Sequence, residues 1–237
     1  MLGRFLEFSL AAPDIQASLD FYAKLGFSQT DVGDAWPHPY AVVTDGRVCL
    51  GLHQAAIVHS LTFVKPDLLK YLQPLEDLGL DFELRRLGDD VFNEVAWFDP
   101  SRQMIRLIEA RTFSPSKRAS IDTSRCGYFL EIALPAHDLE KSKLYYEQFG
   151  FVGIDECDAR LPHIACTSDF IDLGLYGATH LQRAALRFEV EDVKAAMERI
   201  VEVGIAVAEP LPSPLESAVA AMLVAPEGTP ILISASP

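Results

Sequence analysis

FLEFSLAAPDIQASLDFYAKLGF, residues 5–27, returns as FLEIALPAHDLEKSKLYYEQFGF at residues 129–151. Further along each copy, VCLGLH at 48–53 corresponds to IDLGLY at 171–176, and a Pro-His pair precedes both, Pro37-His38 and Pro162-His163. On this alignment the connecting hairpin is two residues longer in the first copy. Such self-similarity indicates a repeated structural unit. The 237 residues leave room for two domains of about a hundred residues each.

Each copy of the repeat predicts a strand followed by a helix. In LEFSL, apolar and polar residues alternate, so Phe8 and Leu10 are expected on one face of the strand and Glu7 on the other. Asp14 is a residue type that caps helix N-termini, and Gly26 follows the apolar stripe as a helix terminator. The pattern therefore predicts one buried face and one mixed face for the strand.

The plan of strand and helix occurs a second time within each copy. SLTFV at 60–64 and ALRFEV at 185–190 are predicted strands, and each precedes a predicted helix that Gly79 or Gly204 ends. Short strands follow, which gives four βαβββ units. We therefore predict an α+β fold with two tandem domains, residues 1–113 and 124–237. The polar segment 114–123 is the predicted linker.

Amino-acid composition and net charge indicate which classes of binding partner are unlikely for this chain. The hydrophobic fraction is 49%, which is typical of a globular chain, and the formal net charge is −14. Such an acidic chain repels phosphate backbones and anionic lipids, so neither nucleic acid nor membrane is an expected partner. There is no C-x-x-C pair, no secretory leader pattern and no Gly-rich phosphate loop. We expect a cytoplasmic protein with free thiols.

The repeated strand–helix pattern with F-Y and L-G-F, and the turn Asp99-Pro100 before a last strand, resemble the vicinal-oxygen-chelate superfamily. That superfamily includes glyoxalases, bleomycin-resistance proteins and extradiol dioxygenases. The resemblance covers essentially the whole chain. It implies that pairs of βαβββ units curl mixed sheets into cups, and that a divalent metal, where used, is bound there by His, Glu or Gln from the first and last strands.

The residues at those implied ligand positions are mostly unsuited to a metal. The first domain has Glu7, Gly51, Ser60 and Arg106, and the second has Glu131, Gly174, Ala185 and Leu232. One oxygen donor per site does not hold a metal, and arginine is not a ligand. We therefore predict no cofactor, and a metal-free small-molecule-binding protein that resembles the bleomycin-resistance branch.

Charged and aromatic side chains on the cup faces are the predicted ligand contacts. A buried carboxylate needs a partner, and we expect a Glu–Arg pair to replace the metal in each cup. The alternative is that these are structural ion pairs only. His53 and Tyr176 occupy matching positions, and Trp36 with Tyr40 could form an aromatic wall. The predicted ligand-binding set is Glu7, His53, Arg106, Glu131, Tyr176 and Arg187.

Other interpretations stay open at the level of sequence. A strand bulge could turn His59 toward Glu7 and His53, which would form a nonstandard site for Ni, Zn, Mn or Fe in a glyoxalase-like lyase, isomerase or dioxygenase. The second domain could instead serve only as an assembly surface. The chain could be a monomer or a homodimer. The units could also pair first with fourth and second with third, which would bring Glu131 near Arg106 and Glu7 near Arg187.

Overall fold

The repeated units build two open mixed sheets in the computed structural model, which describes residues 2–31, 36–89, 92–110, 124–156, 163–208, 211, 215 and 219–236. The predicted linker lies outside these residues. The first sheet has the order β2-β3-β4-β1-β5-β8-β7-β6. Its strands are β1 (Arg4–Ala11), β2 (Ser28–Thr30), β3 (Tyr40–Thr44), β4 (Cys49–His53), β5 (Ser60–Lys65), β6 (Phe82–Arg86), β7 (Glu94–Phe98) and β8 (Met104–Glu109).

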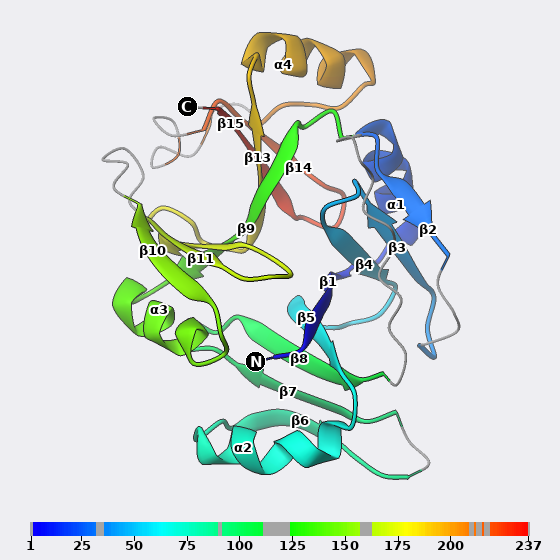
Figure 1. The fold of residues 1–237 in the computed structure, drawn as a ribbon. Coiled ribbons are helices and arrows are strands. Elements are labelled where there is room, and N and C mark those ends of the chain that lie inside the picture. Colours follow the sequence, from blue (N-terminus) through cyan, green and yellow to red (C-terminus); the bar gives the residue numbers. More distant parts are fainter. Residues whose placement is uncertain are drawn as a thin grey trace.

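The second sheet repeats this order as β10-β11-β12-β9-β13-β15-β14. Its fourth unit shows two strands after its helix in the part of the chain described, where three were predicted. The strands are β9 (Tyr128–Ala136), β10 (Val152–Glu156), β11 (His163–Thr167), β12 (Leu173–Gly177), β13 (Ala185–Val190), β14 (Ala221–Val224) and β15 (Pro230–Ala235). Apart from that strand, the sheets confirm the predicted α+β arrangement of βαβββ units (Figure 1).

Aspartate caps begin three of the helices. Asp14, Asp138 and Asp192 each accept a hydrogen bond from the backbone N–H three residues later. After Asp67 no side-chain cap forms, and a 3₁₀ turn η1 precedes the short α2. Pro74 lacks the N–H that a continuous helix would bond to residue 70. The helices are α1 (Ile15–Lys24), η1 (Leu68–Tyr71), α2 (Leu72–Asp77), α3 (Leu139–Glu147) and α4 (Val193–Glu202).

Strand pairing within each sheet joins neighbouring units. β1 runs antiparallel to β5 and β9 antiparallel to β13, so the first unit pairs with the second and the third with the fourth. The alternative pairing of first with fourth unit is therefore wrong for the sheets, and Glu131 lies beside Arg187 in register. In each sheet the first strands of two consecutive units, β1 with β5 and β9 with β13, are central strands that lie side by side.

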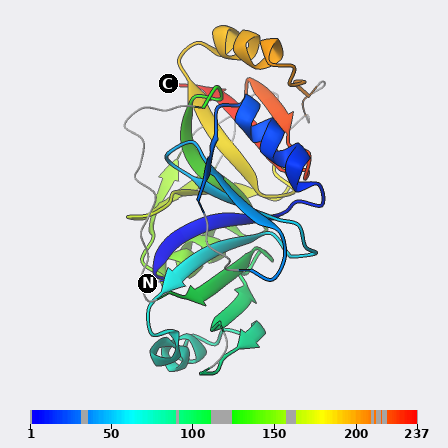
Figure 2. The same cartoon turned by 90° about the vertical axis from the view of Figure 1, so that its right-hand side faces the viewer.

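The helices, in contrast, connect the domains crosswise. On α1, Ser18 and Tyr22 both donate to Glu227 of the fourth unit at 2.7 Å. On α3, Tyr146 donates to Asp99 of the second unit at 2.9 Å. The apolar faces of both sheets contribute to one buried cluster, so the two domains share a core. Figure 2 shows α1, in blue, lying against the C-terminal strands.

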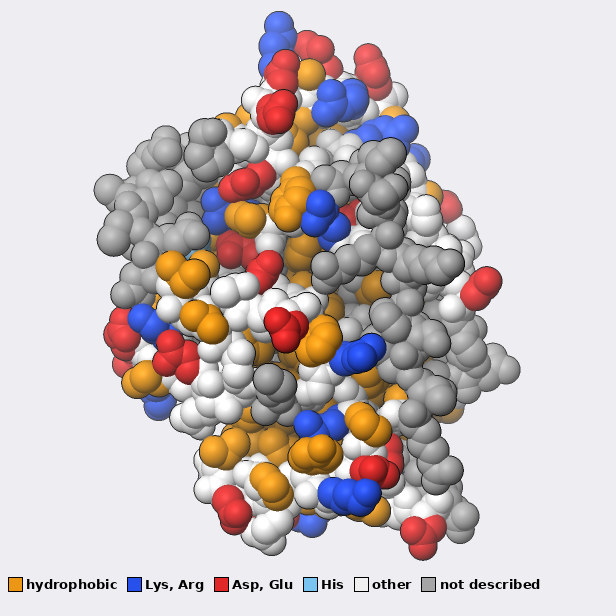
Figure 3. All heavy atoms as spheres, viewed as in Figure 1, with side chains coloured by type: hydrophobic (Ala, Val, Ile, Leu, Met, Phe, Trp, Pro, Cys, Tyr) orange, Lys and Arg blue, Asp and Glu red, His pale blue; other side chains and the backbone are white. Residues whose placement is uncertain are grey.

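The surface carries no large patch of one charge on the face shown in Figure 3, where acidic, basic and hydrophobic side chains are interspersed. Among the helices described, none has the length and apolar character needed to cross a membrane.

Candidate functional site

A buried carboxylate organises the polar face of the first sheet. Glu7 has no exposed surface. Its carboxylate accepts hydrogen bonds from Ser9 at 2.7 Å and from the Tyr40 hydroxyl, and it contacts His53 Nε2 at 3.0 Å. A Cβ added at Gly51 would lie 2.1 Å from Glu7 Oε1. The carboxylate thus fills the space above Gly51, which only glycine leaves free.

A chain of polar groups connects this carboxylate to the rim of the sheet. His53 Nδ1 lies 2.9 Å from Nε2 of the half-buried His38. Trp36 stacks on His38 with ring centres 5.8 Å apart. Burial lowers the pKa of His38, and the nearby His53 and Arg106 add to the effect. Burial, followed by the charge of Glu7, raises the pKa of Tyr40. We call Glu7, Tyr40, His53 and His38 the first polar cluster.

Arg106 lies on the same face but does not pair with Glu7, so the predicted Glu–Arg pair of the first domain is wrong. β5 separates β8 from β1, whereas the adjacent β7 places Glu94 beside Arg106. Glu94 accepts hydrogen bonds from Arg106 and, at 2.7 Å, from Arg86. The Arg106 guanidinium also lies 5.7 Å from the Trp36 ring centre. Glu94 was missed from sequence, although its alternation with Ala96 in EVAWF placed it on this face.

In the second domain the expected Glu–Arg contact is present. Arg187 Nη1 lies 3.2 Å from Glu131 Oε1, because β13 pairs directly with β9 and sets the two residues opposite each other. The Tyr176 hydroxyl donates to Glu131 and accepts from Arg187 at 2.5 Å. The His163 ring stacks on Tyr176 at 4.6 Å. We call Glu131, Tyr176, Arg187 and His163 the second polar cluster.

A tyrosine and a histidine occupy swapped positions in the two clusters. Tyr40 is opposite His53 on β3 and β4, and His163 is opposite Tyr176 on β11 and β12. His163 therefore corresponds to Tyr40 rather than to His38, and the hairpins are of equal length. The alignment of the two Pro-His pairs was wrong because strand register, not the local dipeptide, decides which side chains meet.

The second polar cluster is covered by its own domain. Leu211, Leu215 and Val219 belong to one apolar group with Tyr176 and Leu232, and Leu215 is 4% exposed. Around the first cluster, in contrast, the rim residue Phe92 is 39% exposed and contacts Trp36 at 6.1 Å between ring centres. The first cluster is therefore the better candidate for an open site.

His59 is not part of either cluster. Its ring contacts the edge of Phe8, which lies on the apolar face of β1, at 6.3 Å between ring centres. Since Glu7 and Phe8 point to opposite faces, the structure does not bring His59 to Glu7 and His53. Alternation along the strand, with no bulge at β5 residue 60, explains the separation.

The burial of His59 predicts a pH dependence of stability. Burial lowers its pKa from 6.5, so below about pH 6.5 the unfolded chain binds a proton that the folded chain resists. Above that pH, His59 should not make the free energy of unfolding depend on pH. Below it, the free energy of unfolding should fall as the pH decreases through the folded-state pKa of His59. His59→Gln should remove part of the fall between pH 8 and 5 in urea titrations. His180→Gln is the control, and identical profiles for His59→Gln and wild type would contradict the prediction. His38, whose pKa is also lowered, contributes a fall of the same sign that remains in the variant.

Solved structures share this architecture over the whole chain. A catechol 2,3-dioxygenase matches with a TM-score of 0.62 and 15% identity, covering 98% of this chain and 87% of that one. The halotolerant catechol dioxygenase BphC matches with a TM-score of 0.61 and 13% identity, covering 100% and 87%. A variant of homoprotocatechuate 2,3-dioxygenase from Brevibacterium fuscum matches with a TM-score of 0.62 and 15% identity, covering 98% and 70%.

No protein-family model and no curated protein sequence matches the chain. At these identities the structural likeness shows the fold alone. The chain has the two-sheet fold of the catechol dioxygenases, and the predicted α+β fold of paired βαβββ units is confirmed.

These comparisons correct the prediction that no cofactor is used. That prediction rested on the missing ligands at the positions implied by the family. The structures that share the fold are dioxygenases, and non-haem oxygenases commonly hold iron with two histidines and one carboxylate. A fold shared with dioxygenases is compatible with metal chemistry, and the missing ligands alone did not justify excluding a metal.

The side chains of the first polar cluster do not by themselves fit such a metal. Within the described ranges no group of three or more His, Cys, Asp or Glu side chains is placed to hold an ion. His38, His53 and Glu7 have the appropriate chemistry, but they form a line in which His53 uses one ring nitrogen toward each neighbour. Ligands must instead converge on one point.

Proposed function

We propose that the first polar cluster binds a small organic molecule and transfers a proton to or from it, as an isomerase or lyase does. The observation that supports this proposal is the unbroken hydrogen-bonded line from the buried Glu7 through His53 to His38 at the rim. A buried carboxylate, an orienting imidazole and a terminal base are the parts that general acid–base catalysis requires.

The hydrogen-bonded line from Glu7 through His53 to His38 has one self-consistent set of proton positions when the Glu7 carboxyl group is ionised. Its carboxylate accepts from His53 Nε2–H, which leaves His53 Nδ1 as an acceptor. His38 Nε2–H then donates to His53, and His38 Nδ1 keeps a lone pair. The lowered pKa of His38 favours the neutral form that can accept a proton. We propose that His38 Nδ1 takes a proton from the substrate while His53 and Glu7 stabilise the resulting imidazolium.

Arg106 is the proposed contact for the negative charge that develops on the substrate. Its Nε is buried and has no hydrogen-bond partner among the described residues, although Glu94 accepts from Nη1. A guanidinium with a free N–H stabilises an enolate or carboxylate oxygen. Trp36, stacked on His38 and close to Arg106, would contact a planar substrate. For the second polar cluster we propose a structural role, since its own domain covers it.

The test is solvent-proton exchange. A panel of 2-oxoaldehydes, hydroxy ketones and catechols would be incubated with the protein in deuterium oxide and followed by NMR. For a compound that exchanges, Glu7→Gln and His38→Gln should each slow the rate by about 100-fold, the usual contribution of a positioned acid or base. His180→Gln is the control and should leave the rate unchanged. Exchange that survives both substitutions would refute the proposal.

A second candidate is a metal-dependent dioxygenase, which the fold comparison favours. It predicts that protein offered Fe, Mn, Co, Ni and Zn in turn retains about one equivalent of one metal after desalting. Elemental mass spectrometry on wild type and Glu7→Gln measures this directly. Retention that depends on Glu7, together with oxygen uptake on a catechol, would replace proton transfer as the proposed function.

A further inference from the structure

One edge of the second sheet is apolar and open to solvent. β10 is the outermost strand of that sheet, and Figure 1 shows it at the margin of the molecule beside α3. In the part of the chain that the structure describes, no strand pairs with its outer edge. Val152 is 59% exposed and Ile154 is 51% exposed, although both belong to a regular strand. Such an edge is a template on which a further strand can pair.

The other sheet edges, β2, β6 and β14, are protected against strand pairing. β2 consists of polar residues, and β6 carries three charged ones, Glu83, Arg85 and Arg86. The β14 backbone is covered by a preceding segment, since the Ala208 N–H donates to the Met222 carbonyl at 2.8 Å. Charged side chains and covering loops are the usual devices that keep edges from associating. Among the described residues, β10 has neither device between Val152 and Ile154.

The internal repeat shows that the fold does not require an apolar edge at this place. With the offset of 124 residues, Val152 corresponds to Ser28 and Ile154 to Thr30. β2 and β10 occupy the same position in their sheets, so the same backbone arrangement accepts polar side chains in the first domain. The apolar residues of β10 are therefore better explained by contact with another chain than by the core of this one.

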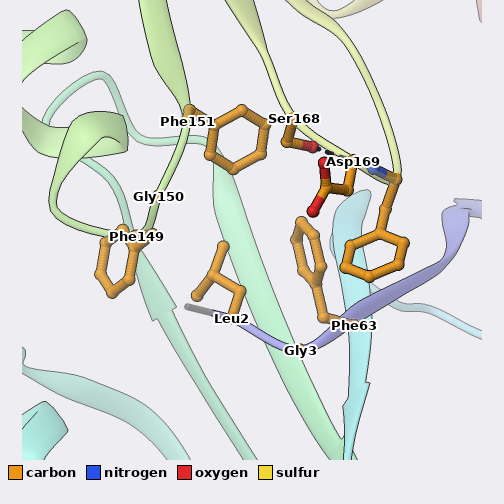
Figure 4. A pocket seen from close by; sticks show the side chains of 9 residues that line it. Leu2, Gly3, Phe63, Phe149, Gly150, Phe151, Ser168 and Asp169 are labelled. Carbon is orange, nitrogen blue, oxygen red and sulfur yellow. Dashed lines mark hydrogen bonds between the residues drawn. The ribbon is translucent and has the colours of Figure 1, made fainter.

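The start of β10 is held in place by the domain contact. Phe149 and Phe151 are 4% and 5% exposed, and Figure 4 shows their rings beside Leu2 of the first domain, where all three line one small hollow. Val152 follows Phe151 and is exposed instead, because successive side chains of a strand point to opposite faces. A strand that is already fixed loses little conformational entropy when it pairs.

Gly153, between the two exposed residues, lies beneath a pair of opposite charges. A Cβ added there would lie 2.7 Å from Lys143 Cγ and 3.1 Å from Glu147 Oε1, so both side chains of α3 cover the strand at this point. If two copies of β10 meet antiparallel at Gly153, the two glycine Cα atoms are about 5 Å apart across a two-fold axis. That axis reverses the order of the charges and sets Lys143 beside Glu147 of the second copy, and the reverse.

We propose that β10 pairs antiparallel with β10 of a second copy of this chain, centred on Gly153. In this register Val152 lies opposite Ile154 of the second copy, so the exposed apolar side chains cover one another on one face. On the other face Lys143 and Glu147 form two ion pairs between the copies. A two-fold dimer needs a surface that matches itself, and this combination provides one. The proposal does not depend on proton transfer in the first polar cluster.

Sedimentation velocity of the full chain over a series of concentrations measures the oligomeric state. A pair of five-residue strands is a small interface, so we expect a dissociation constant on the order of 10 µM. Hydrogen exchange of the β10 backbone amides should slow as the concentration rises, whereas that of β2 should not change. A chain that stays monomeric at about 1 mM, or a dimer whose β10 amides gain no protection, would overturn the proposal.

A lysine on the edge tests the apolar contact. Val152→Lys introduces a charge at an exposed position and should raise the dissociation constant at least about tenfold. Ser28→Lys adds the same charge at the matching position of β2 and should leave the dissociation constant unchanged. Because the net charge is −14, an added lysine reduces the general repulsion between copies, so a loss of dimer has a local cause. Equal effects of the two variants would contradict the proposed interface.

A charge exchange tests whether the partner is a second copy. Lys143→Glu sets like charges around the two-fold axis and should weaken the dimer about tenfold. The double variant Lys143→Glu with Glu147→Lys restores opposite charges across the axis and should restore the dimer. Lys141→Glu, at an exposed position of the same helix, changes the net charge equally and should have little effect. A double variant that stays monomeric, or an equal loss with Lys141→Glu, would refute the proposed pairing.

Discussion

Replacing Arg187 with methionine should lower the free energy of unfolding by about 3–5 kcal/mol, the usual cost of removing one partner from a buried ion pair. Arg187 is 15% exposed and Glu131 is 4% exposed by side chain, so little water would reach the remaining carboxylate. The substitution also removes the hydrogen bond to the Tyr176 hydroxyl. Urea denaturation at neutral pH measures the loss.

Two further variants identify the cause of that loss. Arg183→Met removes an exposed arginine from the same region and should change stability by less than about 0.5 kcal/mol. In the double variant Glu131→Leu with Arg187→Met, no buried charge is left without a partner, so most of the stability should return. A double variant as unstable as Arg187→Met would show that lost packing, and not the unpaired carboxylate, explains the effect.

Gly51→Ala should destabilise the first domain by about 2–3 kcal/mol, a typical cost of overpacking a buried site. The new Cβ would lie 2.1–2.4 Å from the Glu7 carboxylate, which has no exposed surface into which to move. Displacing Glu7 would also break its contacts with Tyr40 and His53. The proton-exchange activity proposed for the first polar cluster should therefore fall with stability.

The double variant Glu7→Ala with Gly51→Ala tests this explanation. When the carboxylate is already absent, the added methyl group has space, so Gly51→Ala should then cost close to nothing. Gly177→Ala is the matched control, because its nearest contact would be 3.3 Å, to the His180 ring, and no buried carboxylate is involved. A full penalty for Gly51→Ala in the Glu7→Ala background would mean that backbone strain, rather than the carboxylate, is responsible.

The two duplicated domains have the same strand arrangement but carry different polar clusters on it. Both retain a glutamate on the first strand and a glycine beneath it. The arginine differs: it is Arg106 on the last strand of the first domain and Arg187 on β13 of the second. Only in the second domain does it reach the glutamate, where apolar side chains then cover the cluster. In the first domain the glutamate instead contacts His53 and Tyr40, and His53 in turn contacts His38.

The sequence alone determined the fold of this protein. The internal repeat and the period-two alternation of Phe8 and Leu10 against Glu7 are local properties, and they predicted βαβββ units, two sheets and the buried position of Glu7. Caps such as Asp14 were likewise readable, because a cap involves residues only three apart. The same alternation explains why His59 lies on the face opposite Glu7 in the structure.

Only the tertiary structure decided which polar side chains meet. Contacts between Glu94 and Arg106, or between His38 and His53, depend on strand order and register, and a shift of two residues changes the partner without changing the face. The covering of the second cluster by Leu215 and Val219 depends on where a segment distant in the sequence packs. The face of each residue was therefore readable from its neighbours along the chain, whereas its partner was set by neighbours across the sheet.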